Sequence, residues 1–178
     1  FNRAYAYPGF IDTHTHSFEG GLYSSGADLS KAQNIDEVLQ LLSAENAKKT
    51  PNEIIFAWQL DEALLQEKRF PTVQELDSVV PDKPLLLRRI DGHSCMLNPF
   101  ARKQIKDLAT STEILRGAEN DHAVHYFHNR LTDDRILEAY QISAKLGLQA
   151  GFCSLHTMIG DAQNSITHFE LIRDNLDK

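Results

Sequence analysis

The chain lacks any apolar run near the roughly 20 residues that a membrane-spanning helix needs. It has only two cysteines, Cys95 and Cys153, which lie far apart and form no Cys-x-x-Cys pattern. We therefore expect free thiols in a reducing compartment rather than a disulfide framework. The first residues contain neither Met nor a signal-peptide pattern. These absences predict a cytoplasmic protein that does not bind membranes, and a chain cut from a longer polypeptide.

Positive charge is also scarce. Lys and Arg number 18 against 25 Asp and Glu, which gives a formal net charge of -7. The basic residues are scattered, apart from short pairs such as Lys48-Lys49 and Arg88-Arg89. Clustered positive charge is the usual mark of a protein that binds nucleic acid or an anionic membrane. We therefore expect neither as a partner; a small-molecule substrate is expected, and a homo-oligomer is left open.

What the chain does contain is an ordinary globular balance over 178 residues, with 42% hydrophobic and 24% charged residues. Apolar strand-like runs alternate with helical patterns, which favours α/β architecture with mostly parallel strands. We expect strands over residues 4–16, 54–60, 84–90 and 150–157, and helices over 35–48, 73–80, 98–106, 132–146 and 166–176. Residues 17–33 are predicted to be a Gly-rich loop and residues 107–120 an irregular connection, while Gly147 is expected to cap the helix before it.

His14 and His16 form the most informative motif. They end the apolar run Pro8-Gly9-Phe10-Ile11-Asp12-Thr13, and in a strand the residues i and i+2 project from the same face. Neutral imidazole nitrogens are good ligands for zinc and neighbouring transition metals. Sites in parallel α/β folds are built where the strands end. The setting therefore predicts that both histidines bind one metal ion.

Four blocks of sequence resemble one enzyme family. Residues 8–16 resemble the first-strand signature of the amidohydrolase superfamily, whose members are metal-dependent hydrolases built on a TIM-type barrel. Three further blocks resemble its amidohydrolase-3 or YtcJ-like branch: Arg88 to His93 with Asn98, Trp58 to Glu62 with Phe70 to Thr72 and Leu76-Asp77, and Leu146 to His156. The blocks occur in the family's order and cover most of the chain.

The resemblance implies a function and a ligand set. His14 and His16 would bind a divalent metal, with zinc the leading candidate, and the parent enzyme would hydrolyse a non-peptide C–N bond of amide or N-formyl type. The other ligands of the family are a carboxylate or carboxylated lysine, two histidines and an aspartate that acts as general base. These have no match here, so no catalytic residue is assigned and the chain alone is expected to be inactive.

The same resemblance implies an architecture. More than a hundred residues separate the two strands that would be neighbours in a simple barrel, and a closed barrel takes about 250 residues. We expect a partial barrel that is not closed: residues 1–21 with the first strand, an α/β insertion over 22–130, and a helix–strand–helix resumption over 131–178. The stretch 107–118 is shorter than the connection usual in the branch, so residues are expected to be missing there.

Other polar residues at strand ends are weaker candidates. His93 either faces the substrate, with Asp91 orienting it, or is a hydrogen-bonded structural histidine. His156 either lines the site or packs, and Thr157 stands where the branch often has Asp. Trp58 either lines the site entrance or is structural.

Two further features favour a structural reading. The series His122, His125 and His128 fits a solvated helix face better than a metal triad. Cys153 is expected to be a buried small residue of a barrel strand. The rival to the enzyme hypothesis is a relative that keeps the fold and binds a small molecule or partner without catalysis.

Overall fold

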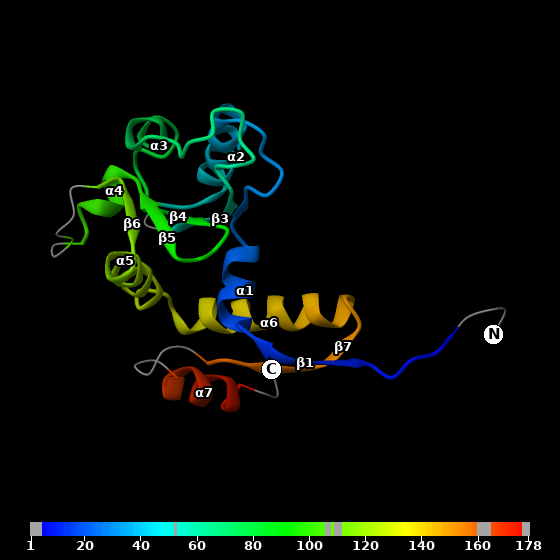
Figure 1. Ribbon diagram of the computed structural model, residues 1–178. Coiled ribbons are helices and arrows are strands. Elements are labelled where there is room, and N and C mark those ends of the chain that lie inside the picture. Colours follow the sequence, from blue (N-terminus) through cyan, green and yellow to red (C-terminus); the bar gives the residue numbers. More distant parts are fainter. Residues whose placement is uncertain (1–4, 52, 106–107, 109–111, 160–164, 176–178) are drawn as a thin grey trace. The chain divides into compact units, whose positions relative to one another are not determined.

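The computed structural model describes residues 5–51, 53–105, 108, 112–159 and 165–175. The chain forms two compact units (Figure 1). Unit 1 comprises Phe1–Leu22 and Thr132–Lys178, and unit 2 comprises Tyr23–Leu131. Each unit has its own sheet, because hydrogen bonding joins the strands into one two-stranded and one five-stranded sheet.

The sheet of unit 2 is mixed. Its strands lie in the order β2-β3-β4-β5-β6, with the bounds Ala27–Asp28, Ile55–Leu60, Leu85–Arg89, Ser94–Leu97 and Ile114–Arg116. The pairs β2–β3 and β3–β4 are parallel, whereas β4–β5 and β5–β6 are antiparallel. The carboxyl ends of β2, β3 and β4 therefore meet at one edge of this sheet.

In the described part of unit 2, four helices accompany this sheet: α2 (Ile35–Lys48), α3 (Val73–Val79), α4 (Pro99–Arg102) and α5 (Ala118–His128). Three of them begin at side-chain caps: Asn34 accepts from the amide of Glu37, Thr72 forms a capping box with Glu75, and Asn98 accepts from the amide of Ala101. The core between α2, α3 and the sheet is apolar and includes the fully buried Val38, Leu42, Ile55, Leu76, Leu85 and Leu87.

Unit 1 contains the parallel pair β1 (Phe10–Thr15) and β7 (Phe152–Thr157). Its helices are α6 (Asp133–Gln149) and α7 (Ser165–Arg173), and α1 (Ser17–Ser24) begins here. Phe10 and Ile11 are 58% and 57% exposed, so this two-stranded sheet leaves apolar side chains uncovered. Within the residues described, the strands form no closed barrel, as expected for a partial barrel.

The predicted loop over residues 17–33 is wrong in its first part. Residues 17–24 form helix α1, and Gly20 donates its amide to the carbonyl of His16 at 2.8 Å. The glycines that suggested a loop have a packing role at Gly21, where a β-carbon would lie 1.7 Å from the carbonyl oxygen of Ala139 in α6. Gly21 therefore allows the backbones of α1 and α6 to approach each other; it does not form a flexible turn.

The predicted irregular connection over 107–120 is also wrong where the structure describes it. Strand β6 and the start of α5 occupy residues 114–120, and β5 is a strand that the sequence pattern did not indicate. The helix expected over 98–106 is only the single turn α4, and residue 106 lies outside the described part. The first strand is shorter than expected and begins at Phe10, since residues 5–9 form no strand; residues 1–4 lie outside the described part.

Helix α6 runs past the expected cap at Gly147. It continues to Gln149, and the residue with positive φ is Gly151, at +90°. The close neighbour of Gly147 is instead the side chain of Leu155 in β7, which would lie 3.1 Å from a β-carbon there. The remaining predicted elements are confirmed, with ends that shift by up to three residues.

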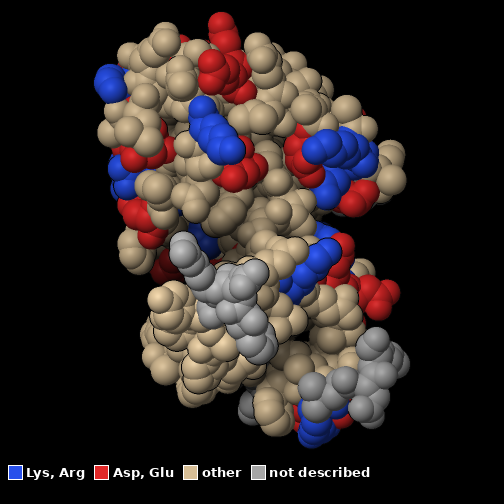
Figure 2. Space-filling view, turned by 90° about the vertical axis from the view of Figure 1, so that its right-hand side faces the viewer, with Lys and Arg blue, Asp and Glu red and all other residues tan. Residues whose placement is uncertain are grey.

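Charged side chains of both signs stand side by side on the face drawn in Figure 2. The ion pairs of the described residues include Arg69 with Glu75 at 2.8 Å, Arg89 with Glu62 at 2.9 Å and Lys48 with Glu45 at 3.0 Å. None of the helices in the described ranges has the length and apolar character required to cross a bilayer.

Candidate metal centre

His14 and His16 lie at the carboxyl end of β1, where the chain passes into α1. Both side chains are exposed, and their ring centroids are 5.4 Å apart with the ring planes inclined at 65°. Two backbone amides hold this end of β1 against β7: that of Met158 donates to the carbonyl of Thr15 at 2.7 Å, and that of Ser17 donates to the side-chain hydroxyl of Thr157 at 3.2 Å. The sheet thus positions both imidazoles on one short segment.

Two carboxylates lie beside the histidines. Oδ1 of Asp12 accepts from the backbone amide of His14 at 3.1 Å, which fixes the chain rather than the ring. Oε2 of Glu19 lies 3.7 Å from Nδ1 of His16. Sequence reasoning did not single out Glu19, although its spacing of three residues from His16 at the start of a helix was a usable signal.

The donor set suits a divalent transition metal. Two imidazoles supply neutral nitrogen ligands of the kind that zinc and its neighbours bind. Over the described ranges, no group of three or more His, Cys, Asp and Glu side chains is close enough to hold a metal ion. The two imidazoles alone are thus two candidate ligands, whereas a structural zinc site has four.

His156 lies in β7, the parallel neighbour of β1. Its side chain is exposed at the same end of this sheet, since Thr15 pairs with Thr157. Thr157, which replaces the Asp often found in the branch, accepts the amide hydrogen of Ser17 and so has a structural role here. His14, His16 and His156 all belong to unit 1.

The other three predicted residues belong to unit 2, at the edge where β3 and β4 end. Trp58 is half-buried, and its Nε1 atom is buried without an acceptor among the described residues. The next residue, Gln59, has φ of +63°, and the register between β3 and β4 shifts there. A non-glycine residue in the left-handed region marks a constrained backbone.

Asp91 and His93 are both exposed in the turn after β4. Asp91 does not orient the His93 ring as expected, because its Oδ1 accepts from the backbone amide of His93 at 3.0 Å. Its Oδ2 accepts from Arg89 at 2.7 Å. Arg89 also donates to both oxygens of Glu62, and this hydrogen bonding lowers the pKa of the Glu62 carboxyl. The turn is thus held by a three-residue charge network.

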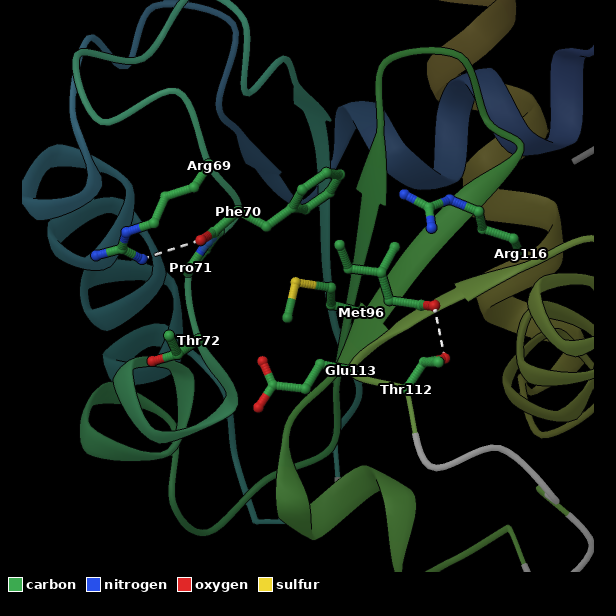
Figure 3. Close-up of a pocket in the computed structure, with 9 residues that line it drawn as sticks. Arg69, Phe70, Pro71, Thr72, Met96, Thr112, Glu113 and Arg116 are labelled. Atoms are coloured by element: carbon green, nitrogen blue, oxygen red, sulfur yellow. Dashed lines mark hydrogen bonds between the residues drawn. The ribbon is translucent and has the colours of Figure 1, made fainter.

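A pocket of about 310 Å³ lies elsewhere in unit 2 (Figure 3). Its lining includes the apolar side chains of Met96 and Phe70 and the charged side chains of Arg69, Glu113 and Arg116 (Figure 3). Arg69 is already paired with Glu75. None of the residues predicted for the site lines this pocket, so it is separate from the candidate centre.

Two minor predictions need correction. His128 is not on a solvated face, because its Nε2 lies 3.1 Å from the hydroxyl of Tyr23, and its ring lies 6.2 Å from that of Phe56. His122 and His125 are exposed, as expected. Cys153 is exposed rather than buried, because the two-stranded sheet leaves its side uncovered.

Comparison with known proteins supports the resemblance. The chain is similar to YtcJ of Bacillus subtilis (strain 168), an amidohydrolase by name, with 30% identity over 100 residues, or 56% of this chain and 19% of that protein. It is similar to the N-substituted formamide deformylase of Arthrobacter pascens, with 29% identity over 96 residues, or 53% of this chain and 18% of that protein. The chain thus spans less than a fifth of the length of these curated relatives.

A solved structure shows the same fold. The crystal structure of an uncharacterized metal-dependent hydrolase from Pyrococcus furiosus superposes with a TM-score of 0.69 at 24% identity, over 94% of this chain and 35% of that one. The chain therefore has a partial TIM-type fold. The model of the family described as "Amidohydrolase family" matches residues 4–174, which is nearly the whole sequence. The chain belongs to the amidohydrolase family, in its amidohydrolase-3 branch.

Proposed function

We propose that this chain supplies two metal ligands, His14 and His16, to an amidohydrolase that cleaves a non-peptide C–N bond of a small molecule. The observation that carries the proposal is the pair of exposed imidazoles at the junction of β1 and α1, 5.4 Å apart. The relative named N-substituted formamide deformylase supports an amide or N-formyl substrate.

Zinc is the leading candidate for the metal, because both ligands present are imidazoles. When bound, such an ion supplies polarisation of a carbonyl and activation of water. The role of this chain is to bind the ion through one ring nitrogen of His14 and one of His16. The bonds between Thr15 and Met158 and between Ser17 and Thr157 keep that segment in place.

The chain alone is expected to bind zinc weakly and to show no turnover. Among the described residues, no third His, Cys, Asp or Glu side chain completes a group with this pair that could hold a metal ion. The remaining ligands and the base would come from the rest of the polypeptide, since the relatives are more than five times as long as the matched segments.

We also propose that residues 22–130 are an α/β insertion between two barrel segments, 1–21 and 131–178. The parallel pairing of β1 with β7, which lie far apart in the sequence, supports this arrangement. The separate five-stranded sheet of unit 2 supports it as well.

Four further residues are proposed to contact substrate. His156 is exposed at the end of β7, beside the end of β1. Trp58, Asp91 and His93 lie where the parallel strands β3 and β4 end, which is the usual place of ligand sites in such sheets.

The test is hydrolysis of N-substituted formamides and simple amides by the whole zinc-loaded protein. We expect kcat/KM to fall at least about a hundredfold in His14→Ala and in His16→Ala, since each loses a ligand of the metal that activates water. His122→Ala, which removes an exposed histidine of α5, should retain full activity. Undiminished hydrolysis by His14→Ala would contradict the proposal. Turnover by the 178-residue chain that disappears in this variant would contradict the expectation that the chain alone is inactive, and would imply that a complete site is present.

The second candidate is a binding protein that keeps the fold without catalysis. The observation that favours it is that no group of three His, Cys, Asp or Glu side chains in the described residues could hold a metal ion. Metal content and turnover of the whole protein separate the two functions. A stoichiometric metal with hydrolysis supports the enzyme, and ligand binding without hydrolysis by the metal-loaded protein supports the binding protein.

A further inference from the structure

Glu19 lies in the first turn of α1, three residues after His16. The carbonyl of His16 accepts from the amide of Gly20 at 2.8 Å, so His16 stands at the start of this helix. Residues three apart at a helix start face the same side. This places Oε2 of Glu19 at 3.7 Å from Nδ1 of His16, with the two side chains 39% and 61% exposed.

The contact distinguishes the two nitrogens of the imidazole. A carboxylate near Nδ1 favours the tautomer in which Nδ1 carries the hydrogen, and Nε2 then keeps its lone pair. Histidines that bind metals commonly donate their other ring N–H to a carboxylate, which fixes both the tautomer and the ring orientation. The 3.7 Å separation is longer than a hydrogen bond but within the range of an ion pair.

We propose that Glu19 is a positioning residue that holds His16 with Nδ1 protonated and Nε2 directed to the metal. The inference rests on the proposed function, because it assumes that His16 binds the ion. It gives Glu19 a role through the metal-binding residue His16, not through direct contact with the metal. Asp12, the other nearby carboxylate, has a different partner, the backbone amide of His14.

Glu19 could instead be a third metal ligand, which would need Nδ1 of His16 and the carboxylate to face one ion. The geometry does not favour this, since the described side chains include no cluster of three that could hold a metal. The two roles predict different metal-bound nitrogens on His16: Nε2 for a positioning role and Nδ1 for a ligand role.

The test is ¹⁵N NMR of the imidazole nitrogens in the 178-residue chain, with and without zinc. In the metal-free chain at about pH 8.5, where imidazole is neutral, His16 should carry its hydrogen mainly on Nδ1. Glu19→Ala should lose this preference, and Glu19→Gln should keep part of it, because the amide oxygen still accepts. Asp133→Ala is the matched control, since it removes an exposed acid from the first turn of α6.

With zinc, we expect coordination through Nε2 of His16 in the wild-type chain. The Kd should rise up to about tenfold in Glu19→Ala, at the low end of such effects because the pair is exposed. An unchanged tautomer in Glu19→Ala, or zinc bound through Nδ1, would overturn the inference. If zinc does not bind even the wild-type chain, the proposed function fails, and the metal-free spectra still decide whether Glu19 sets the tautomer.

Discussion

A β-carbon at Gly21 in α1 would lie 1.7 Å from the carbonyl oxygen of Ala139 in α6. The two helices therefore meet backbone to backbone at this point, and only glycine leaves room for the contact. In the same helix, a β-carbon at Gly20 would meet nothing within 4 Å. Adjacent glycines thus have different roles, which makes them a matched pair for mutation.

Gly21→Ala is expected to lower the free energy of unfolding by at least about 2 kcal/mol, because the added methyl group overpacks a backbone contact. Gly20→Ala should be neutral or raise it by up to about 1 kcal/mol, because alanine is the better helix former. Urea denaturation followed by circular dichroism measures both. Equal stability of the two variants would show that α1 and α6 are not packed as described.

The ion pair of Arg69 with Glu75 predicts a pH dependence of stability. The hydrogen bond from Arg69 lowers the pKa of Glu75 from 4.5 to about 2. A carboxyl with a lowered folded pKa stabilises the protein above its unfolded pKa, and this contribution is lost as the pH falls towards the folded pKa.

Glu75→Gln is therefore expected to unfold at slightly lower urea concentration than the wild type near pH 6. The difference should shrink between pH 4.5 and about 2, the two pKa values of this carboxyl. Glutamine keeps the capping box with Thr72, so the comparison isolates the charge. Urea midpoints of both proteins at several pH values test this. A difference that stays constant down to the lowest pH would contradict the assignment to Glu75.

The two cysteines should react at very different rates. Cys95 is fully buried, and loss of solvation raises the pKa of its thiol to about 12, whereas Cys153 is exposed. Since the thiolate is the reactive form, a thiol reagent should modify one equivalent quickly and the second only on unfolding. Cys153→Ser should abolish the fast phase. Two fast equivalents in the native chain would show that β5 is not buried as described.

The sequence predicted those elements whose local signals agree with their packing. Helix α2 has both an Asn34 cap and apolar residues at helical spacing, and it forms where expected. Helix α5 was predicted only as a helix face around His122, His125 and His128. It has many polar residues, yet its buried side chains follow a helical spacing: Asn120, Ala123, Val124 and Phe127. That spacing could have predicted the helix from the sequence. The packing role of Gly21 could not be predicted, because it depends on Ala139, which is far away in the sequence.

The candidate site was predictable only in part, because residue spacing indicates which side chains share a face but not which atoms they contact. The spacing of His14 and His16 indicates that they share a face, and the structure places their rings close together. The partner of Asp91 could not be read from spacing, because a carboxylate two residues before a histidine can reach either its ring or its amide. The structure shows that it accepts from the amide.

The central claim is that His14 and His16 bind one metal ion. Titration of the 178-residue chain with zinc in a calorimeter tests it most directly, with His14→Ala, His16→Ala and the control His122→Ala measured alongside. The account predicts one weak site in the wild type and in His122→Ala, and no binding in either of the other variants. Zinc binding that survives both His14→Ala and His16→Ala would contradict it.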